Sequence, residues 1–333
     1  MLDTKDIAVV ILNWNGKDLL KQFLPSIIEH SENATIYVAD NASTDNSVSL
    51  VSEHFPTVKI IQNIDNGGYA KGYNDALKNV QEPLLCLVNS DIEVTKDWLK
   101  PVLKEFDDHP STAIIQPKIL DYKDKSKFEY AGAAGGFIDK YGYPYCRGRI
   151  FNTVEEDKGQ YNDIIDIFWA SGACFFIRNA VFNNLNGFDE SYFAHMEEID
   201  LCWRAFNQNH QIKYVGHSTV YHVGGATLKT NNPKKTYLNF RNNIRLIIRN
   251  TPKWRLVYLI PIRVALDWVA AFLFWKNESF KHFVAVFSAH LDALKSLRAD
   301  LSHNNRSFPG ILNHKGMILF KYYLGSKNEY RRL

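Results

Sequence analysis

Cysteine is scarce in this chain, and its few copies are scattered. Only 4 cysteines occur in 333 residues: Cys86, Cys146, Cys174 and Cys202. None forms the close pair of a zinc site, and together they lack the density of a disulfide framework. The residues before the apolar run at 7–12 also lack the features of a secretory leader. We therefore expect a protein of the reducing cytoplasm.

A large excess of one charge is missing as well. The chain has 39 basic and 36 acidic residues, a formal net charge of +3, which gives no support for nucleic-acid binding. Hydrophobic residues make up 46% of the chain, enough to bury the core of one large or two modest domains.

Residues 7–120 alternate short apolar runs with helix-like segments. Expected strands are 7–13, 35–40, 58–63, 84–89 and 113–119, and expected helices are 17–30, 45–54, 69–80 and 95–107. Thr95 is a plausible cap for the last of these helices, and Pro110 follows its end. This alternation predicts a mainly parallel sheet with crossover helices, a doubly wound nucleotide-binding fold.

The middle of the chain is less regular. Residues 121–165 are rich in Gly, Tyr and charge without a clean period, so we expect long loops there. Beyond them we expect a strand at 173–178, helices at 179–185 and 197–208, and one or two strands within 212–223.

After residue 236 the pattern becomes helical. Residues 237–250 place apolar side chains near one face, while Arg241, Arg245 and Arg249 recur every four residues on another. A basic amphipathic helix of this kind suits an anionic membrane surface. Ordinary packing within the protein or against a second subunit explains the pattern equally well.

The next stretch, 255–275, is nearly long enough to span a bilayer. Charges such as Arg263 and Asp267 interrupt it, and a central charge costs about 2.5–3.5 kcal/mol on insertion scales. We therefore expect this segment to lie on a membrane rather than cross it.

Polar residues follow the expected strands of the first half. They are Asn13 after the first strand, Asp40 after the second, Asn66 and Gly68 after the third, and Asn89, Ser90 and Asp91 after the fourth. Because ligands of such sheets bind at the carboxyl ends of the strands, these side chains are candidate ligand contacts. Asp40 could bind a ribose or a base, or it could cap the following helix.

Asp91 is a candidate ligand for a divalent cation. Mg²⁺ characteristically uses one or two protein carboxylates and takes its other ligands from phosphate and water. Such a cation would neutralise a diphosphate leaving group. The alternative is that Asn89, Ser90 and Asp91 only form a turn or cap. His222, after a later strand, is a possible second metal ligand, although a lone histidine is more often structural.

A second acidic cluster opens the helix expected at 197–208. Glu198 is the best candidate for a base that removes a proton from an attacking hydroxyl, and Glu197 and Asp200 are further candidates. These acids could instead only complement the positive end of the helix. Trp169 could line an acceptor pocket or belong to the core. A cation-binding acid and a separate base together indicate sugar transfer.

The ordered motifs resemble family 2 of the inverting glycosyltransferases, which have the GT-A fold. The matching segments are 10–16, 38–45, 66–74, 89–91 and 197–204. Each segment is weak alone, and their order makes the resemblance specific. The resemblance implies a GT-A catalytic domain at 1–236, with a nucleotide-binding half at 1–120 and an acceptor-side half at 121–236. Residues 237–333 would form a helical region.

The resemblance also implies residue roles. Asp40 contacts the nucleotide, residues from Asn66 to Asn74 shape the donor pocket, and Asp91 holds Mg²⁺ or Mn²⁺. Asn89 stands where the family's metal motif commonly has an acid, so His222 would assist Asp91. Glu198 stands where the family commonly has Asp.

Within the family, the chain is most similar to the rhamnosyltransferase-like branch. That branch implies transfer from dTDP-rhamnose or a UDP-sugar to a saccharide or lipid-linked saccharide, in bacterial surface polysaccharide synthesis at the inner face of the membrane.

Three other functions compete with this interpretation. A dehydrogenase would need a three-glycine turn after the first strand, where the chain has Asn-Trp-Asn-Gly. A sugar nucleotidyltransferase would need a basic glycine-rich loop near the start, and Lys17 alone is poor support for one. A non-catalytic carbohydrate-binding scaffold would have no need of acids at both sites.

Overall fold

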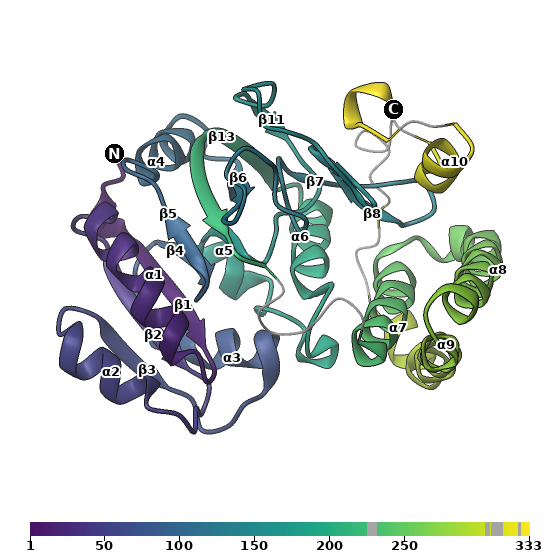
Figure 1. Ribbon diagram of the computed structural model, residues 1–333, viewed down its shortest axis with the longest axis horizontal. Coiled ribbons are helices and arrows are strands. Elements are labelled where there is room, and N and C mark those ends of the chain that lie inside the picture. The colour runs from purple at the N-terminus through teal and green to yellow at the C-terminus, as the bar shows by residue number, and fades with distance from the viewer. Residues whose placement is uncertain (225–231, 304–306, 308–315, 326–327) are drawn as a thin grey trace.

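A computed structural model describes residues 1–224, 232–303, 307, 316–325 and 328–333. A nine-stranded mixed sheet with helices on both faces forms its centre, and a helical region lies beyond one end of the sheet (Figure 1). The strands are β1 (Ile7–Asn13), β2 (Thr35–Asp40), β3 (Lys59–Gln62), β4 (Leu84–Asn89), β5 (Ile92–Val94), β6 (Thr112–Asp121), β11 (Ile164–Asp166), β12 (Cys174–Arg178) and β13 (Gln211–His222). Their order is β11-β13-β6-β12-β4-β1-β2-β3, with β5 beside β13.

The helices that cover the sheet are α1 (Lys17–His30), α2 (Ser47–His54), α3 (Gly68–Leu77), α4 (Leu99–Asp108), α5 (Asn179–Asn184) and α6 (Glu197–Asn207). Alternate residues of β1 enter two different apolar clusters: Ala8 and Val10 join one, and Ile7, Val9 and Ile11 join the other. Both faces of the strand are therefore buried, as a continuous apolar run requires. Because β1 pairs in parallel with β2 and β4, and β2 with β3, their carboxyl ends meet at one edge.

Long loops were expected at 121–165, and this expectation was wrong. The segment contains β7 (Gly136–Ile138), β8 (Pro144–Cys146), β9 (Arg149–Ile150) and β10 (Thr153–Val154), which form a separate four-stranded antiparallel sheet, while β11 joins the main sheet. Strands of two or three residues are too short to show a period. The glycines also have a packing role, because the ring of Trp169 lies only 2.1 Å from where a Cβ of Gly136 would stand.

The helix expected at 95–107 starts later, at Leu99. Thr95 does not cap it, because its hydroxyl donates to the carbonyl of Thr219 at 2.7 Å. This bond ties the start of the segment to β13, next to the unexpected strand β5.

The helical region consists of α7 (Pro233–Asn250), α8 (Lys253–Asn277) and α9 (Phe280–Leu301). Asn232 caps α7 by accepting from the amide of Lys234, and Pro233 stands at the first helical position. The later helix α10 (Ile318–Tyr323) packs elsewhere, with Tyr322 against Phe151 in the turn between β9 and β10.

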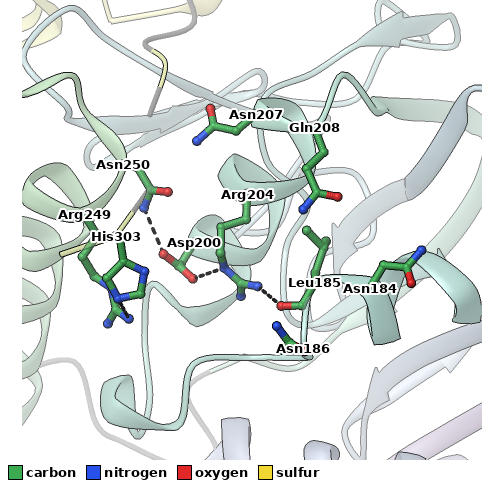
Figure 2. Close-up of a pocket in the computed structure, with 10 residues that line it drawn as sticks. All are labelled: Asn184, Leu185, Asn186, Asp200, Arg204, Asn207, Gln208, Arg249, Asn250 and His303. Atoms are coloured by element: carbon green, nitrogen blue, oxygen red, sulfur yellow. Dashed lines mark hydrogen bonds and ion pairs between the residues drawn. The ribbon is translucent and has the colours of Figure 1, made fainter. Parts of the chain in front are cut away.

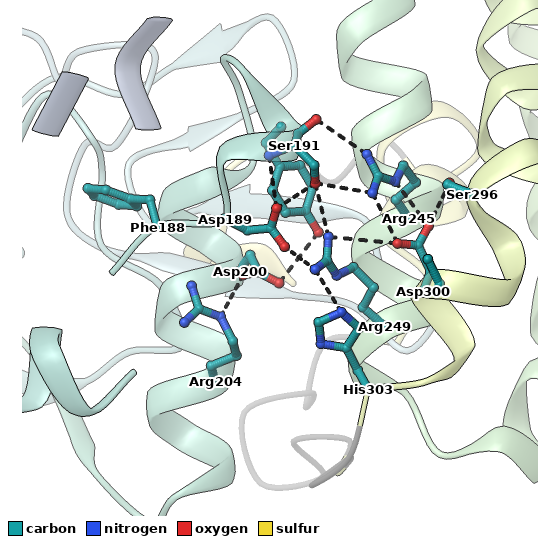
Figure 3. A network of polar contacts seen from close by, with 12 residues as sticks. Phe188, Asp189, Ser191, Asp200, Arg204, Arg245, Arg249, Ser296, Asp300 and His303 are labelled. Atoms are coloured by element: carbon teal, nitrogen blue, oxygen red, sulfur yellow. Dashed lines mark hydrogen bonds and ion pairs between the residues drawn. The ribbon is translucent and has the colours of Figure 1, made fainter. Parts of the chain in front are cut away.

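The arginines of α7 had two interpretations, a basic outer face for a membrane or packing within the protein, and the structure distinguishes between them. Arg245 and Arg249 are only 8% and 7% exposed. Arg245 donates to Asp300 of α9 at 3.0 and 3.1 Å, and Arg249 pairs with Asp189 (Figure 3). Asp300 and Asp189 lie on other elements, so the sequence period of α7 does not show that its arginines have buried partners. The alternative of packing within the protein therefore holds for α7.

Candidate active site

The ends of β1 and β2 are joined by a polar network. Asn13 and Asp40 are register partners, and the Asn13 amide donates to the Asp40 carboxylate at 3.0 Å. The other oxygen of Asp40 accepts from the backbone amide of Ser43 at 3.0 Å. Asp40 is buried and orders the loop that leaves β2. Ser90 comes from the end of β4 and lies beside Gly16 in the loop after β1.

The segment after β3 connects two parts of the edge. Asn66 accepts from the amide of Asn41 at 2.9 Å and from the backbone of Gly68 at 3.1 Å. Gly68 has a φ of +82°, and a Cβ there would stand 2.6 Å from the carbonyl oxygen of Phe193. Only glycine fits this approach. The helix α3 that follows is thereby held against the loop before α6.

Asn74 of α3 strengthens the same junction. Its side chain donates to the carbonyl of Phe188 and accepts from the backbone amide of Phe188, both at 2.9 Å. These two bonds fix the start of the loop that leads to α6.

Asp91 and His222 meet where β4 and β13 end. The Nε2 atom of His222 lies 3.1 Å from the Asp91 carboxylate and 3.4 Å from the amide nitrogen of Asn89. On the other side of the ring, Nδ1 lies 3.4 Å from the carboxylate of Glu129. Burial alone would lower the pKa of His222, but Asp91 and Glu129 outweigh it and raise that pKa to about 10.

This donor set fits a partly protein-bound cation. No group of three or more His, Cys, Asp or Glu side chains is arranged to hold a metal ion among the residues that the structure describes. A cation that binds here would displace a proton from the His222 ring, because a histidine ligand is neutral. Asp91 and His222 would then supply two ligands, leaving the remaining positions to phosphate and water, as Mg²⁺ and Mn²⁺ sites allow. Glu129 faces the second nitrogen of His222, as a carboxylate does behind a metal-binding histidine.

Glu129 was missed in the sequence. It lies in the irregular stretch 121–165, where no strand end marked it. Its 4% exposure is unusual for a glutamate and becomes visible only in three dimensions.

Glu197 and Glu198 are the first two residues of α6. One oxygen of each carboxylate, Oε2, is buried without a hydrogen-bond partner among the described residues. Burial raises the pKa of Glu198 to about 7, and burial together with the Glu198 charge raises the pKa of Glu197 well above its usual value. A carboxylate poised near neutral pH suits proton transfer.

The loop before α6 is strained and firmly held. Phe193, His195 and Met196 all have positive φ angles, of 63°, 69° and 76°, which bulky residues rarely adopt. The side-chain amide of Asn242, on α7, donates to the carbonyls of Tyr192, Ala194 and His195 at 3.1, 2.9 and 2.8 Å. Such strain persists only where the surroundings enforce it, and here it precedes Glu197 directly.

The two acidic sites both adjoin the segment before β12. The backbone amide of Asn89 donates to the carbonyl of Ala173 at 2.9 Å. The preceding residue, Gly172, accepts from the hydroxyl of Tyr69 at 2.8 Å, and a Cβ on Gly172 would stand 3.8 Å from that of Glu198. Burial, and also the charges of Glu129 and Glu198, raise the pKa of Cys146. The structure thus brings Asp91, His222 and Glu198 to one edge.

Asp200 and Trp169 lie apart from this edge. The Asp200 carboxylate accepts from Arg204 at 2.7 Å and from Asn250 at 2.9 Å (Figure 2), so its contacts hold α6 against α7. Trp169 is buried and donates to the carbonyl of Phe137 at 2.8 Å, as a core residue does.

Asp200 also lines a polar cavity of about 150 Å³ between α5, α6 and α7. Its lining residues are Asn184, Leu185, Asn186, Asp200, Arg204, Asn207, Gln208, Arg249, Asn250 and His303 (Figure 2). The cavity is smaller than the roughly 300–1,000 Å³ of ligand pockets and includes no strand-end residue, so we do not place the reaction there.

Comparison with known proteins identifies a family and relatives that this chain resembles. The profile of the family described as glycosyl transferase family 2 matches residues 8–185, more than half of the 333-residue chain. The N-acetylglucosaminyl-diphospho-decaprenol L-rhamnosyltransferase of Mycobacterium tuberculosis is 24% identical over 236 residues, which cover 66% of this chain and 76% of that protein.

Two solved structures share the fold. S. aureus TarS 1–349 in complex with UDP-GlcNAc has a TM-score of 0.57 and 16% identity, covering 87% of this chain and 81% of its own. The mannosyltransferase PcManGT of Pyrobaculum calidifontis, in complex with GDP-Man and Mn²⁺, has a TM-score of 0.53 and 13% identity. The match covers 89% of this chain and 87% of PcManGT.

Proposed function

The chain belongs to glycosyl transferase family 2 and has the GT-A fold, and from that premise we propose that it inverts the anomeric centre of a nucleotide sugar while transferring the sugar to a saccharide or lipid-linked saccharide hydroxyl. Membership of this family sets aside the dehydrogenase, nucleotidyltransferase and scaffold alternatives. The proposed catalytic domain is 1–236, and 237–333 forms the accompanying helical region.

The observation that carries this proposal is the position of the two acidic sites. Asn89, two residues before Asp91, bonds to Ala173, and Glu198 lies against Gly172, so both acidic sites adjoin this short segment. We propose that the anomeric carbon is bound between them. An in-line displacement needs leaving-group stabilisation and base on opposite sides of the anomeric carbon.

On the donor side, Asp91 and His222 would hold Mg²⁺ or Mn²⁺, with Glu129 orienting the His222 ring. When bound there, the cation neutralises negative charge that develops on the departing diphosphate. Asn13, Asp40 and Asn66 order the loops that would surround the nucleotide. The Mn²⁺ bound in PcManGT supports a divalent ion without choosing between the two.

On the acceptor side, Glu198 accepts the proton of the attacking hydroxyl. The oxygen of that hydroxyl forms its bond to the anomeric carbon as the bond from that carbon to the diphosphate breaks. Proton and nucleoside diphosphate therefore leave on opposite sides, and the configuration inverts. The unpartnered oxygen of Glu198 and its raised pKa both support this role.

The similarity to a rhamnosyltransferase that acts on a polyprenyl diphosphate sugar favours dTDP-rhamnose, or a UDP-sugar, as donor. It also favours a lipid-linked acceptor at the inner face of the membrane, in surface polysaccharide synthesis.

A thermal-shift screen of nucleotide sugars with and without Mn²⁺ tests the donor side, because a ligand at 100 times its dissociation constant adds about 2.7 kcal/mol to stability. We expect one donor to raise the melting temperature only when Mn²⁺ is present. In the Asp91→Ala variant this dependence on Mn²⁺ should disappear. A full Mn²⁺-dependent shift in Asp91→Ala would refute the assigned cation site.

A further inference from the structure

The outer surfaces of α8 and α9 carry an unusual concentration of exposed apolar side chains. On α8 they form two groups, one between residues 254 and 262 and one between 269 and 275, and on α9 they recur every three or four residues from Phe280 to Leu294. We call this surface the apolar face; its members are Trp254, Val257, Tyr258, Ile262, Val269, Phe272, Leu273, Trp275, Phe280, Val284, Phe287, Leu291 and Leu294. Trp254 is 69% exposed and Leu294 is 64% exposed. Soluble surfaces rarely gather so many large apolar side chains.

The charges that interrupt the apolar sequence of α8 do not reach this face. Arg263 and Asp267 are 2% and 1% exposed. Arg263 donates to Asn243 of α7 at 2.6 Å, and Asp267 lies 3.2 Å from the Nε2 atom of His290 on α9. These contacts place the polar side of α8 inside the helical region and leave an uninterrupted apolar side outward.

Aromatic contacts make the two helices one unit. Trp268 of α8 packs edge-on against Phe287 of α9, and Trp275 packs against Phe280. In Figure 1, α8 and α9 form the edge of the molecule farthest from α1 and α2. The apolar face therefore belongs to a firm hairpin at the periphery, away from the sheet.

The exposed charges around the apolar face are mostly of one sign. Lys253 and Lys276 stand at the two ends of α8, and Lys281, Lys295 and Arg298 are exposed on α9. Glu278 is an exposed acid of the hairpin, and the half-buried Asp292 pairs with Lys295 at 2.6 Å. This basic rim complements anionic headgroups, whereas two copies of the same face would oppose like charges.

From these observations we propose that the apolar face binds an anionic membrane surface, with α8 and α9 lying in the interfacial layer. Trp and Tyr side chains favour that layer, and lysines beside it reach the headgroups. By length and composition α8 could cross a membrane, and only 22% of its most apolar window is buried, unlike the mostly buried helix of a protein core. Crossing would expose Arg263 and Asp267 to hydrocarbon and break their contacts with α7 and α9, so we favour the interfacial position.

This proposal keeps the expectation that segment 255–275 lies on a membrane, and it changes which basic residues take part. It uses the apolar residues of α8 and α9 and their lysines, and not the arginines of α7, which are engaged inside the protein. The inference does not depend on the transfer reaction, because vesicle binding can be measured without substrate.

Flotation of the full chain with lipid vesicles tests the proposal. We expect binding to phosphatidylcholine vesicles that contain phosphatidylglycerol and weaker binding to phosphatidylcholine alone. The double variant Val269→Ser and Leu273→Ser should lower the partition coefficient about tenfold or more, because two large exposed apolar groups no longer enter the interface. Ile164→Ser, which removes an exposed apolar group of β11 on the main sheet, should bind like the parent chain.

The basic rim has its own test. Lys276→Glu combined with Lys281→Glu should remove the preference for phosphatidylglycerol, since about 1 kcal/mol of attraction per basic residue, or roughly fivefold, is lost for each. Thermal melts confirm that each variant is folded.

Two results would overturn the proposal. The first is the absence of vesicle binding, most clearly if light scattering shows a dimer that Val269→Ser and Leu273→Ser convert to a monomer, because the face would then bind a second copy. The second is equal binding to both vesicle types, which would remove the anionic partner.

Discussion

The carboxyl edge of the sheet and the helical region both carry clusters of charge, but they use it in opposite ways. At the edge, Glu198 keeps a carboxylate oxygen without a partner among the described residues, and Asp91 shares His222 with Glu129. In the helical region, Arg245 and Arg249 are paired with Asp300 and Asp189. An acid with an unpartnered oxygen marks the proposed site of chemistry, whereas arginines paired with acids hold the helices to the catalytic part.

The same contrast appears within α6 itself. Glu198 and Asp200 are two residues apart, yet only Asp200 is saturated by Arg204 and Asn250. One helix thus presents the proposed base to the edge and a structural acid to α7.

Removing the proposed base should reduce the rate of transfer more than any other change considered below. Glu198→Gln should slow transfer by about 10²–10⁴-fold, the usual contribution of a positioned base, while donor binding stays near normal. Single-turnover transfer and donor titration measure the two quantities separately. Full activity in this variant would move the base to Glu197.

Removing a paired arginine should change stability instead. Arg245→Gln leaves Asp300 buried with fewer donors, so we expect the free energy of unfolding to fall by about 2–4 kcal/mol. Arg298→Gln, at an exposed position of α9, is the control and should change it by less than about 0.5 kcal/mol. Folded Arg245→Gln should still bind vesicles; selective loss of lipid binding would return α7 to the membrane surface.

Glu129→Gln should weaken cation binding about 10–100-fold, because His222 loses the carboxylate that orients its ring. The Mn²⁺ concentration that half-saturates donor binding measures this effect. Glu156→Gln, on the same segment but exposed and paired with Lys158, is the matched control. An unchanged Mn²⁺ requirement in Glu129→Gln would separate Glu129 from the cation site.

The smallest effect concerns the loop before α6. Asn242→Ala removes three hydrogen bonds to that strained loop, so kcat should fall about tenfold as Glu198 loses its fixed position, with KM for the donor unchanged. Asn243→Ala, which loses contacts to Gly142 and Arg263 instead, should lower stability without this change in kcat. Equal kcat losses in both variants would indicate a general loss of folding.

Much of the first half could be predicted, because the apolar run of a buried strand is visible in the strand's own residues. The strands at 7–13, 35–40 and 84–89 were expected with the bounds that the structure has, and parallel pairing then brings Asn13, Asp40 and Asn89 to one edge. Membership of glycosyl transferase family 2 and the GT-A fold are also confirmed. The roles of the individual site residues stay predictions.

What escaped prediction depends on contacts between distant segments. Glu129 gains its place only when β6 and β13 bring it to His222, and the direction of Arg245 depends on Asp300, 55 residues later. A helix period shows which residues share a face, but it does not show what covers that face. The short strands between 136 and 154 are likewise defined by their pairing partners, not by their own sequence.

The pH dependence of transfer tests directly whether Glu198 is the proton acceptor. With saturating Mn²⁺ and donor binding checked at each pH, kcat/KM should rise about tenfold per pH unit on the acid side and level off above pH 7, because Glu198, whose pKa burial raises to about 7, acts only when deprotonated. In Glu198→Gln the remaining rate should be low and lack this inflection. An inflection near pH 7 that persists in Glu198→Gln would contradict the assignment of Glu198 as the proton acceptor.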